Sequence, residues 1–184
     1  MIRTAISSDI PQMLAIYGPY VTNTTISFEY AVPTESEFTH RFLGITEQFP
    51  WLVWEEDGHI LGYAYASPPF HRAAYRWCAE ASIYLRPEAQ GRGIGRKLYS
   101  ALEQILTEQG YRKIYAIITA GNDASIAFHK AVGYRFVAEF PECGIKFGKL
   151  LGITWMEKVL ISGDLSTVFP VSARSIVQNG RNFS

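Results

Sequence analysis

One stretch of the sequence constrains the fold more than any other. An apolar run that ends at Leu85 is followed by the glycine-rich turn QGRGIG and then by helical spacing up to Gln109. Glycine adopts left-handed backbone conformations at little steric cost, and the first turn of a helix has N–H groups with no intrahelical acceptor. The helix dipole makes that end partly positive, so a strand, glycine turn and helix in this order predict a site for a diphosphate.

The spacing of this turn argues against two common phosphate sites. A Walker loop continues as Gly-Lys-Ser/Thr, but Lys97 is followed by Leu98. A dinucleotide fingerprint needs GxGxxG and an acidic residue about twenty positions later. The glycines here alternate as GxGxG, and the next apolar run, 113–120, ends without an acid. Nicotinamide binding is therefore not expected.

Composition narrows the class of protein. The 184 residues are 48% hydrophobic and 18% charged, which is typical of one globular domain with a single core. Seventeen basic and seventeen acidic residues cancel, so neither nucleic acid nor a membrane surface is an expected partner. No signal-peptide core or membrane-spanning run is evident, so we expect a cytoplasmic location. Cys78 and Cys143 are then expected to be free, buried thiols.

Capping residues, prolines and periodicity predict the order of elements. The expected order is a strand 2–6, a helix capped by Ser8 and Asp9, a loop 22–33, a helix with a Thr34–Glu37 capping box, a hairpin of 51–55 with 60–67 through Asp57-Gly58, a strand 77–85, a helix 92–109 ended by Gly110, a strand 113–120, a short helix capped by Asn122 and Asp123, and a closing strand pair of 134–140 with 149–159 joined by the loop CGIKFG. We interpret 1–160 as one domain and 161–184 as an extension that is mobile or loosely docked.

This order and the QGRGIG turn resemble the GNAT superfamily of N-acyltransferases over residues 1–160. The segments ISFEY (26–30), AYRWCAEASIYL (74–85) and NDASIAFHKAVGY (122–134) are similar to its phosphinothricin and methionine sulfoximine acetyltransferase branch. The resemblance implies an α/β (α+β) fold with a mixed, mostly antiparallel central sheet flanked by helices. It also implies acetyl-CoA as co-substrate, a small amino-acid-like amine as acceptor, a homodimer, and no metal.

Glu80 is the candidate general base. It lies in the middle of the apolar run WCAEASIYL, where burying a carboxylate is costly unless something compensates. An ammonium must lose a proton before it attacks a thioester, and the resemblance places a glutamate on this strand for that task. Two structural interpretations stay open: Glu80 faces solvent, or it pairs with Arg72 or Arg76.

The resemblance also assigns the acyl-donor site. A backbone N–H of Tyr84 or Leu85 would polarise the thioester carbonyl, and His129 stands where many relatives have a tyrosine that protonates the leaving thiolate. Asn122 would contact the pantetheine arm or simply cap a helix, with Ser125 beside it. The full set of predicted donor-site residues is Ile83, Tyr84, Leu85, Gln90, Gly91, Arg92, Gly93, Ile94, Gly95, Arg96, Lys97, Asn122 and Ser125.

The predicted acceptor site is carried by two loops. By resemblance, Phe28 and Glu29 on one loop and Arg72 and Tyr75 on another lie near the acceptor amine. An arginine can hold an amino-acid carboxylate bidentately, and Arg76 or His71 are alternatives to Arg72 for this role.

Three rival functions stay open on the sequence. The acceptor could be another amine, such as a polyamine or a protein N-terminus. The chain could instead be a non-catalytic acyl-CoA sensor. A covalent relay through Cys78 is the third possibility, although no histidine stands next to Cys78 in the sequence.

Overall fold

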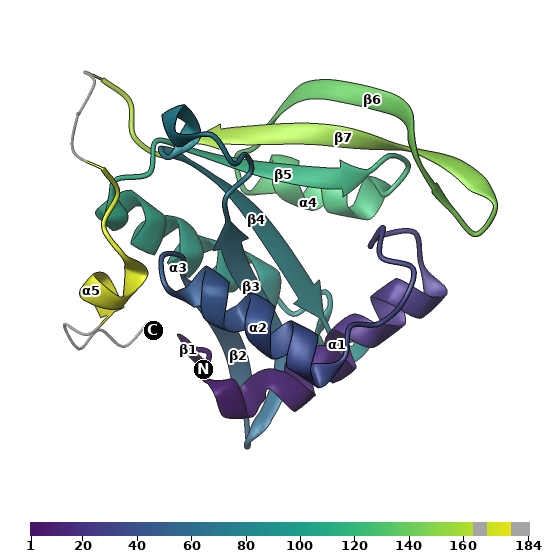
Figure 1. Ribbon diagram of the computed structural model, residues 1–184, viewed down its shortest axis with the longest axis horizontal. Coiled ribbons are helices and arrows are strands. Elements are labelled where there is room, and N and C mark those ends of the chain that lie inside the picture. Colours follow the sequence, from purple (N-terminus) through teal and green to yellow (C-terminus); the bar gives the residue numbers. More distant parts are fainter. Residues whose placement is uncertain (164–168, 178–184) are drawn as a thin grey trace.

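Within the residues that the computed structural model describes, 1–163 and 169–177, seven strands form one mixed sheet (Figure 1). The strands are β1 (Ile2–Thr4), β2 (Trp51–Glu56), β3 (His59–Ser67), β4 (Cys78–Leu85), β5 (Lys113–Thr119), β6 (Arg135–Lys146) and β7 (Lys149–Val159). Their order across the sheet is β1-β2-β3-β4-β5-β7-β6, and each neighbouring pair is antiparallel except β4 with β5. The predicted mixed, mostly antiparallel sheet is confirmed.

The α-helices cover both faces of this sheet (Figure 1). They are α1 (Ile10–Asn23), α2 (Glu35–Thr46), α3 (Ile94–Gln109), α4 (Asp123–Ala131) and the short α5 (Ala173–Val177). Helices α1 and α2 pack on one face, over Trp51, Val53 and Tyr63. Helices α3 and α4 pack on the other, where alternate residues such as Leu52 and Ala64 point. The two-residue period of a strand thus supplies two cores from one sheet.

Local signals place most element ends where the sequence predicts them. Thr34 accepts a hydrogen bond from the Glu37 N–H at 3.2 Å, and the Glu37 carboxylate accepts one from the Thr34 N–H at 2.8 Å, which completes the predicted capping box. Asp57 and Gly58 have φ values of +50° and +78°, as a two-residue hairpin turn requires. Gly110 ends α3 with φ +100°.

Several local predictions are wrong, and three of them have a clear physical reason. Helix α3 begins at Ile94 and not at 92, because Gly93 is still in the left-handed region. Asp9 makes no side-chain cap for α1, since its carboxylate pairs with Arg3 at 2.6 Å and accepts the Ile6 N–H at 2.8 Å. The segment CGIKFG is not a loop: its first four residues belong to β6, and only Phe147-Gly148 turn the chain.

The described part of the C-terminal extension lies against the body of the protein. The Gln109 side chain donates a hydrogen bond to the Val171 carbonyl at 2.6 Å, and the Ala173 N–H donates to the Gln48 carbonyl at 3.0 Å. Ala173 is buried, and α5 contacts α3. The prediction of a mobile or loosely docked extension also covers 164–168 and 178–184, which lie outside the described residues.

No helix in the described part of the chain combines the length and the apolar character that crossing a bilayer requires.

Candidate functional site

The candidate site lies where β4 and β5 separate. Their parallel pairing covers only Cys78–Glu80 with Lys113–Tyr115, and beyond it the strands diverge (Figure 1). Strand β4 stays paired with β3 as far as Leu85, so the opposite edge of 81–85 has no strand partner among the described residues. A small cavity of about 70 Å³ lies in this split. An amide-bearing ligand can therefore extend the sheet at this edge.

The predicted glycine turn follows directly and leads into α3. Gly91 and Gly93 have φ values of +72° and +79°, and a Cβ at either position would meet no atom within 4 Å. Both glycines therefore serve the backbone conformation and not close packing. Gly93 is the N-cap of α3 and has no side chain that could cap the helix. The first N–H groups of α3 therefore remain available to an anion. This arrangement fits a diphosphate.

The side chains of this turn contact the protein in several ways. Arg92 pairs with Glu56 at 2.9 Å, Arg96 donates to the Ala131 carbonyl at 3.3 Å, and the Lys97 ammonium lies 5.3 Å from the centre of the Trp54 ring. All three basic side chains are exposed, as is Gln90, whereas Ile94 and Gly95 are buried. Any contact of Ile94 with a ligand would therefore come from its backbone.

Strand β4 presents backbone groups to the split. Tyr84 packs between the rings of Tyr17 and Tyr20, at 4.8 and 5.2 Å between centres. The Leu85 N–H meets the Tyr20 hydroxyl only at 3.4 Å, while that hydroxyl donates to the Leu85 carbonyl at 2.6 Å. Ile83 packs partly against the α3 core. The Leu85 N–H is thus weakly bonded and open to a stronger acceptor.

Glu80 is the last residue of β4 that pairs with β5. Its neighbours Ala79 and Ala81 enter the α3 core, so its side chain points to the opposite face. No hydrogen bond or ion pair joins its carboxylate to another described residue; neither Arg72 nor Arg76 is its partner. Burial raises its pKa to about 7. A group with this pKa accepts and releases protons at neutral pH.

His129 and Tyr99 form a buried pair beside the split. The His129 Nδ1 lies 2.8 Å from the Ser125 carbonyl, which can only accept, so Nδ1 carries the proton. Nε2 then accepts from the Tyr99 hydroxyl at 2.9 Å. Burial lowers the pKa of His129 and raises that of Tyr99. Tyr99 is not predicted from the sequence, because its spacing with Leu98 and Leu102 indicates only a core position.

Asn122 and Ser125 also line the split. The Asn122 carbonyl oxygen accepts a hydrogen bond from the Ser125 N–H at 3.2 Å, which makes Asn122 the N-cap of α4. Its amide N–H₂ makes no hydrogen bond with any residue in the described ranges and is free to donate to a ligand. Capping and ligand contact are therefore compatible.

The loop that carries Phe28 and Glu29 is held by the tip of the β6–β7 hairpin. The buried Lys146 ammonium donates to the Ser27 carbonyl at 2.5 Å, and burial lowers its pKa. The Phe28 ring occupies the space where a Cβ at Gly144 would be. Glu29 pairs with Arg41 at 2.6 Å through one carboxylate oxygen. Neither Lys146 nor Arg41 is predicted from the sequence.

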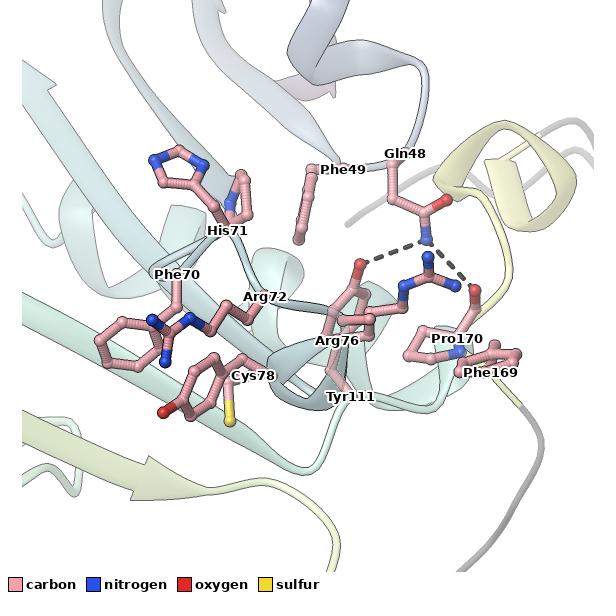
Figure 2. A pocket seen from close by; sticks show the side chains of 13 residues that line it. Gln48, Phe49, Phe70, His71, Arg72, Arg76, Cys78, Tyr111, Phe169 and Pro170 are labelled. Carbon is pink, nitrogen blue, oxygen red and sulfur yellow. Dashed lines mark hydrogen bonds between the residues drawn. The ribbon is translucent and has the colours of Figure 1, made fainter.

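Arg72 and Tyr75 lie elsewhere. They line a cavity of about 420 Å³ at the start of β4, together with His71, Arg76 and Cys78 (Figure 2). Phe28 and Glu29 instead lie near the end of β5, where Thr119 donates to the carbonyl of residue 25 at 2.8 Å. Arg72 and Tyr75 thus lie at the start of β4, and the loop of Phe28 and Glu29 lies at the end of β5.

The part of the chain that the structure describes contains no group of three or more metal-ligating side chains.

Comparisons with known proteins show that this chain is similar to acetyltransferases. Residues 2–155 match the family model described as an acetyltransferase (GNAT) domain. The chain is 35% identical to a phosphinothricin N-acetyltransferase of Alcaligenes faecalis over 165 residues, which cover 89% of this chain and 84% of the relative. It is 34% identical to an L-methionine sulfoximine/L-methionine sulfone acetyltransferase of Pseudomonas aeruginosa, with coverage of 85% and 92%.

A solved structure is similar over nearly the whole chain. It is a GNAT superfamily phosphinothricin acetyltransferase from Sinorhizobium meliloti in complex with AcCoA, with a TM-score of 0.85 and 36% identity. The match covers 93% of this chain and 92% of that one.

Proposed function

Since this chain belongs to the GNAT acetyltransferase family and is an N-acetyltransferase, we propose that it acetylates the α-amine of small amino-acid-like molecules. The expected acceptors are of the phosphinothricin or methionine sulfoximine type, as the names of its relatives suggest. The predicted family, fold and enzyme class are confirmed by these matches. The donor is acetyl-CoA, the molecule bound in the Sinorhizobium meliloti structure.

One observation carries the proposed chemistry: an unpaired carboxylate with a pKa of about 7 lies where two parallel strands part. The α-amine of an amino acid is protonated at neutral pH and cannot attack a carbonyl in that form. Glu80 would accept this proton, directly or through one water, and become a neutral carboxylic acid. The neutral amine is then the nucleophile.

The residues around the split fit acetyl-CoA. The first N–H groups of α3 and the turn at Gly91 and Gly93 would hold the diphosphate. The free edge of 81–85 would pair with the amides of the pantetheine arm, and Asn122 would donate to that arm. Bound acetyl-CoA would supply an activated thioester carbonyl, and the weakly bonded N–H of Leu85 would polarise it.

The leaving thiolate needs a proton, and Tyr99 with His129 would supply it. The Tyr99 hydroxyl donates to His129 Nε2 in this structure, and both residues line the split. We therefore propose that Tyr99 donates and that His129 orients its hydroxyl.

Direct transfer is favoured over a covalent relay. Burial raises the pKa of the Cys78 thiol, which disfavours the thiolate that a relay would need.

We also propose a homodimer in the cytoplasm. The edge strand β6 and its neighbour β7 expose several large apolar side chains, and a second copy would cover them. The exposed residues are Phe136, Val137, Phe140, Ile145 and Leu150. Light scattering coupled to size exclusion should give twice the mass of the chain, and a monomer at micromolar concentration would contradict this.

The test of function is release of free CoA thiol from acetyl-CoA across a panel of acceptors. The panel contains phosphinothricin, methionine sulfoximine, proteinogenic amino acids, a polyamine and an N-terminal peptide. We expect the first two to give the highest kcat/KM. Preferential turnover of the polyamine or the peptide would replace the proposed acceptor, and CoA binding without turnover of any acceptor would favour a sensor.

A further inference from the structure

The cavity at the start of β4 holds two guanidinium groups, those of Arg72 and Arg76 (Figure 2). It has a volume of about 420 Å³, enough for a small amino acid or an analogue. His71 also lines it, and none of the described residues that line it is an aspartate or a glutamate. Throughout 1–163 and 169–177, no ion pair joins Arg72 or Arg76 to a carboxylate. Either guanidinium group can therefore pair with an anionic group of a bound molecule.

The two guanidinium groups are held apart by different supports. Figure 2 shows the Arg72 guanidinium beside Phe70, and the Arg76 guanidinium on the side of Gln48 and Phe169. The Arg76 guanidinium carbon lies 5.0 Å from the centre of the Phe169 ring, a stacking contact that orients the group. Two separated guanidinium groups match one molecule with two anionic groups better than a single carboxylate.

The wall beside Arg76 comes from outside the family-matched region. Phe169 and Pro170 lie beyond residue 155, where the match to the family model ends. Gln48 fixes this wall by donating to the Tyr111 hydroxyl and to the Pro170 carbonyl, both at 3.2 Å (Figure 2). Aromatic side chains on this wall reduce the access of water, which strengthens an ion pair formed there. Phe169 and Pro170 thus shape the Arg76 half of the cavity.

The cavity lies close to Glu80 along β4. Cys78 lines it, and Glu80 lies two residues further along β4 on the same face of the sheet. Two residues of a strand span about 7 Å, so a molecule bound in the cavity can bring its amine to Glu80. The inference below rests on the proposed function, because it concerns the acceptor of that reaction.

We propose that this cavity binds acceptors with two anionic groups, one on each guanidinium, and that Arg76 determines this specificity. The α-carboxylate and a distal phosphinate, phosphonate or second carboxylate are such a pair. Phosphinothricin carries both, whereas methionine sulfoximine has a neutral distal group of similar size. The enzyme therefore prefers the phosphinothricin type.

The test compares these two acceptors in Arg76→Gln and Arg76→Lys. Loss of a charge-assisted hydrogen bond pair should lower kcat/KM for phosphinothricin about tenfold to a hundredfold in Arg76→Gln. For methionine sulfoximine the change should stay below about twofold. Arg76→Lys should recover part of the preference. The matched control is Arg174→Gln, which removes an exposed positive charge from α5 without touching the cavity.

The possible outcomes are distinct. An equal loss for both acceptors, or no loss for either, overturns the inference and leaves the proposed function intact. If the wild type acetylates neither acceptor, the proposed function fails, and calorimetry with phosphinothricin then decides the binding site alone. Heat that Arg76→Gln abolishes supports the site, and absence of heat in the wild type refutes it.

Discussion

Replacing Glu80 by glutamine separates its catalytic role from a structural one. The carboxylate pKa of about 7 means that about a tenth of the molecules have the base form at pH 6 and about nine tenths at pH 8. The wild-type kcat/KM for the acceptor should therefore rise about tenfold between these values. In Glu80→Gln this rise of kcat/KM with pH should disappear. The kcat should fall by about a hundredfold or more, with acetyl-CoA affinity unchanged.

The same substitution makes a stability prediction of defined sign. Burial raises the folded-state pKa of Glu80 from 4.5 to about 7, so the folded state binds this proton more tightly than the unfolded state. The stability contributed by the protonated form is lost as the pH rises through 7. Glutamine does not ionise and carries no such cost. The unfolding free energy of Glu80→Gln relative to the wild type should therefore increase by about 2 to 3 kcal/mol between pH 5 and pH 8.5.

Thermal unfolding at both pH values measures this difference. For a chain of this length the gain corresponds to a Tm shift of roughly 5 to 10 °C. The control is Glu139→Gln, at an exposed position on β6. It should leave the rise of kcat/KM between pH 6 and pH 8 unchanged. A stability difference that does not change with pH would show that Glu80 is not desolvated. If kcat/KM of Glu80→Gln still rises between pH 6 and pH 8, the base is another group.

Three further substitutions test the donor site and the fold. Gly93→Ala strains a residue at φ +79° and should raise the acetyl-CoA KM several-fold. Its control, Gly58→Ala at φ +78°, should lower Tm by a similar amount without changing this KM. The same acetyl-CoA KM in both variants would refute the role of Gly93. Tyr99→Phe removes the hydroxyl bonded to His129 and should lower kcat at least about tenfold, so an unchanged kcat excludes Tyr99 as the acid. Thr34→Ala should lower the urea unfolding free energy by about 1 kcal/mol, and no loss would contradict the capping argument.

The parts of the fold that the sequence predicts correctly are those set by local interactions. The capping box at Thr34 joins atoms three residues apart, and the turn at Asp57-Gly58 depends on two backbone conformations. The glycine turn before α3 belongs to the same class. In each case the residues that determine the structure are adjacent in the chain, so their pattern is readable without knowledge of the fold.

The incorrect or missing predictions depend on contacts between distant residues. Gly144 resembles a loop residue, but β6 continues through it because Leu151 pairs with it across the hairpin and the Phe28 ring fills the space beside it. Residues 170 and 171 are held by Gln48 and Gln109, which lie more than 60 positions away. Neither contact has a local signature. The grouping of Arg72 with Phe28 at one acceptor site stays a prediction.

One structural feature, the early end of the β4–β5 pairing, accounts for both halves of the proposed chemistry. Pairing that continued past Glu80 would occupy the β4 edge that the pantetheine arm needs. It would also bring β5 alongside residues 81–85 and close the split where the amine must meet the thioester. A carboxylate well outside the split would be solvated and keep a pKa near 4.5, too acidic to accept a proton at neutral pH. The last paired position is where a carboxylate is desolvated enough to titrate near 7 and still reach an acceptor.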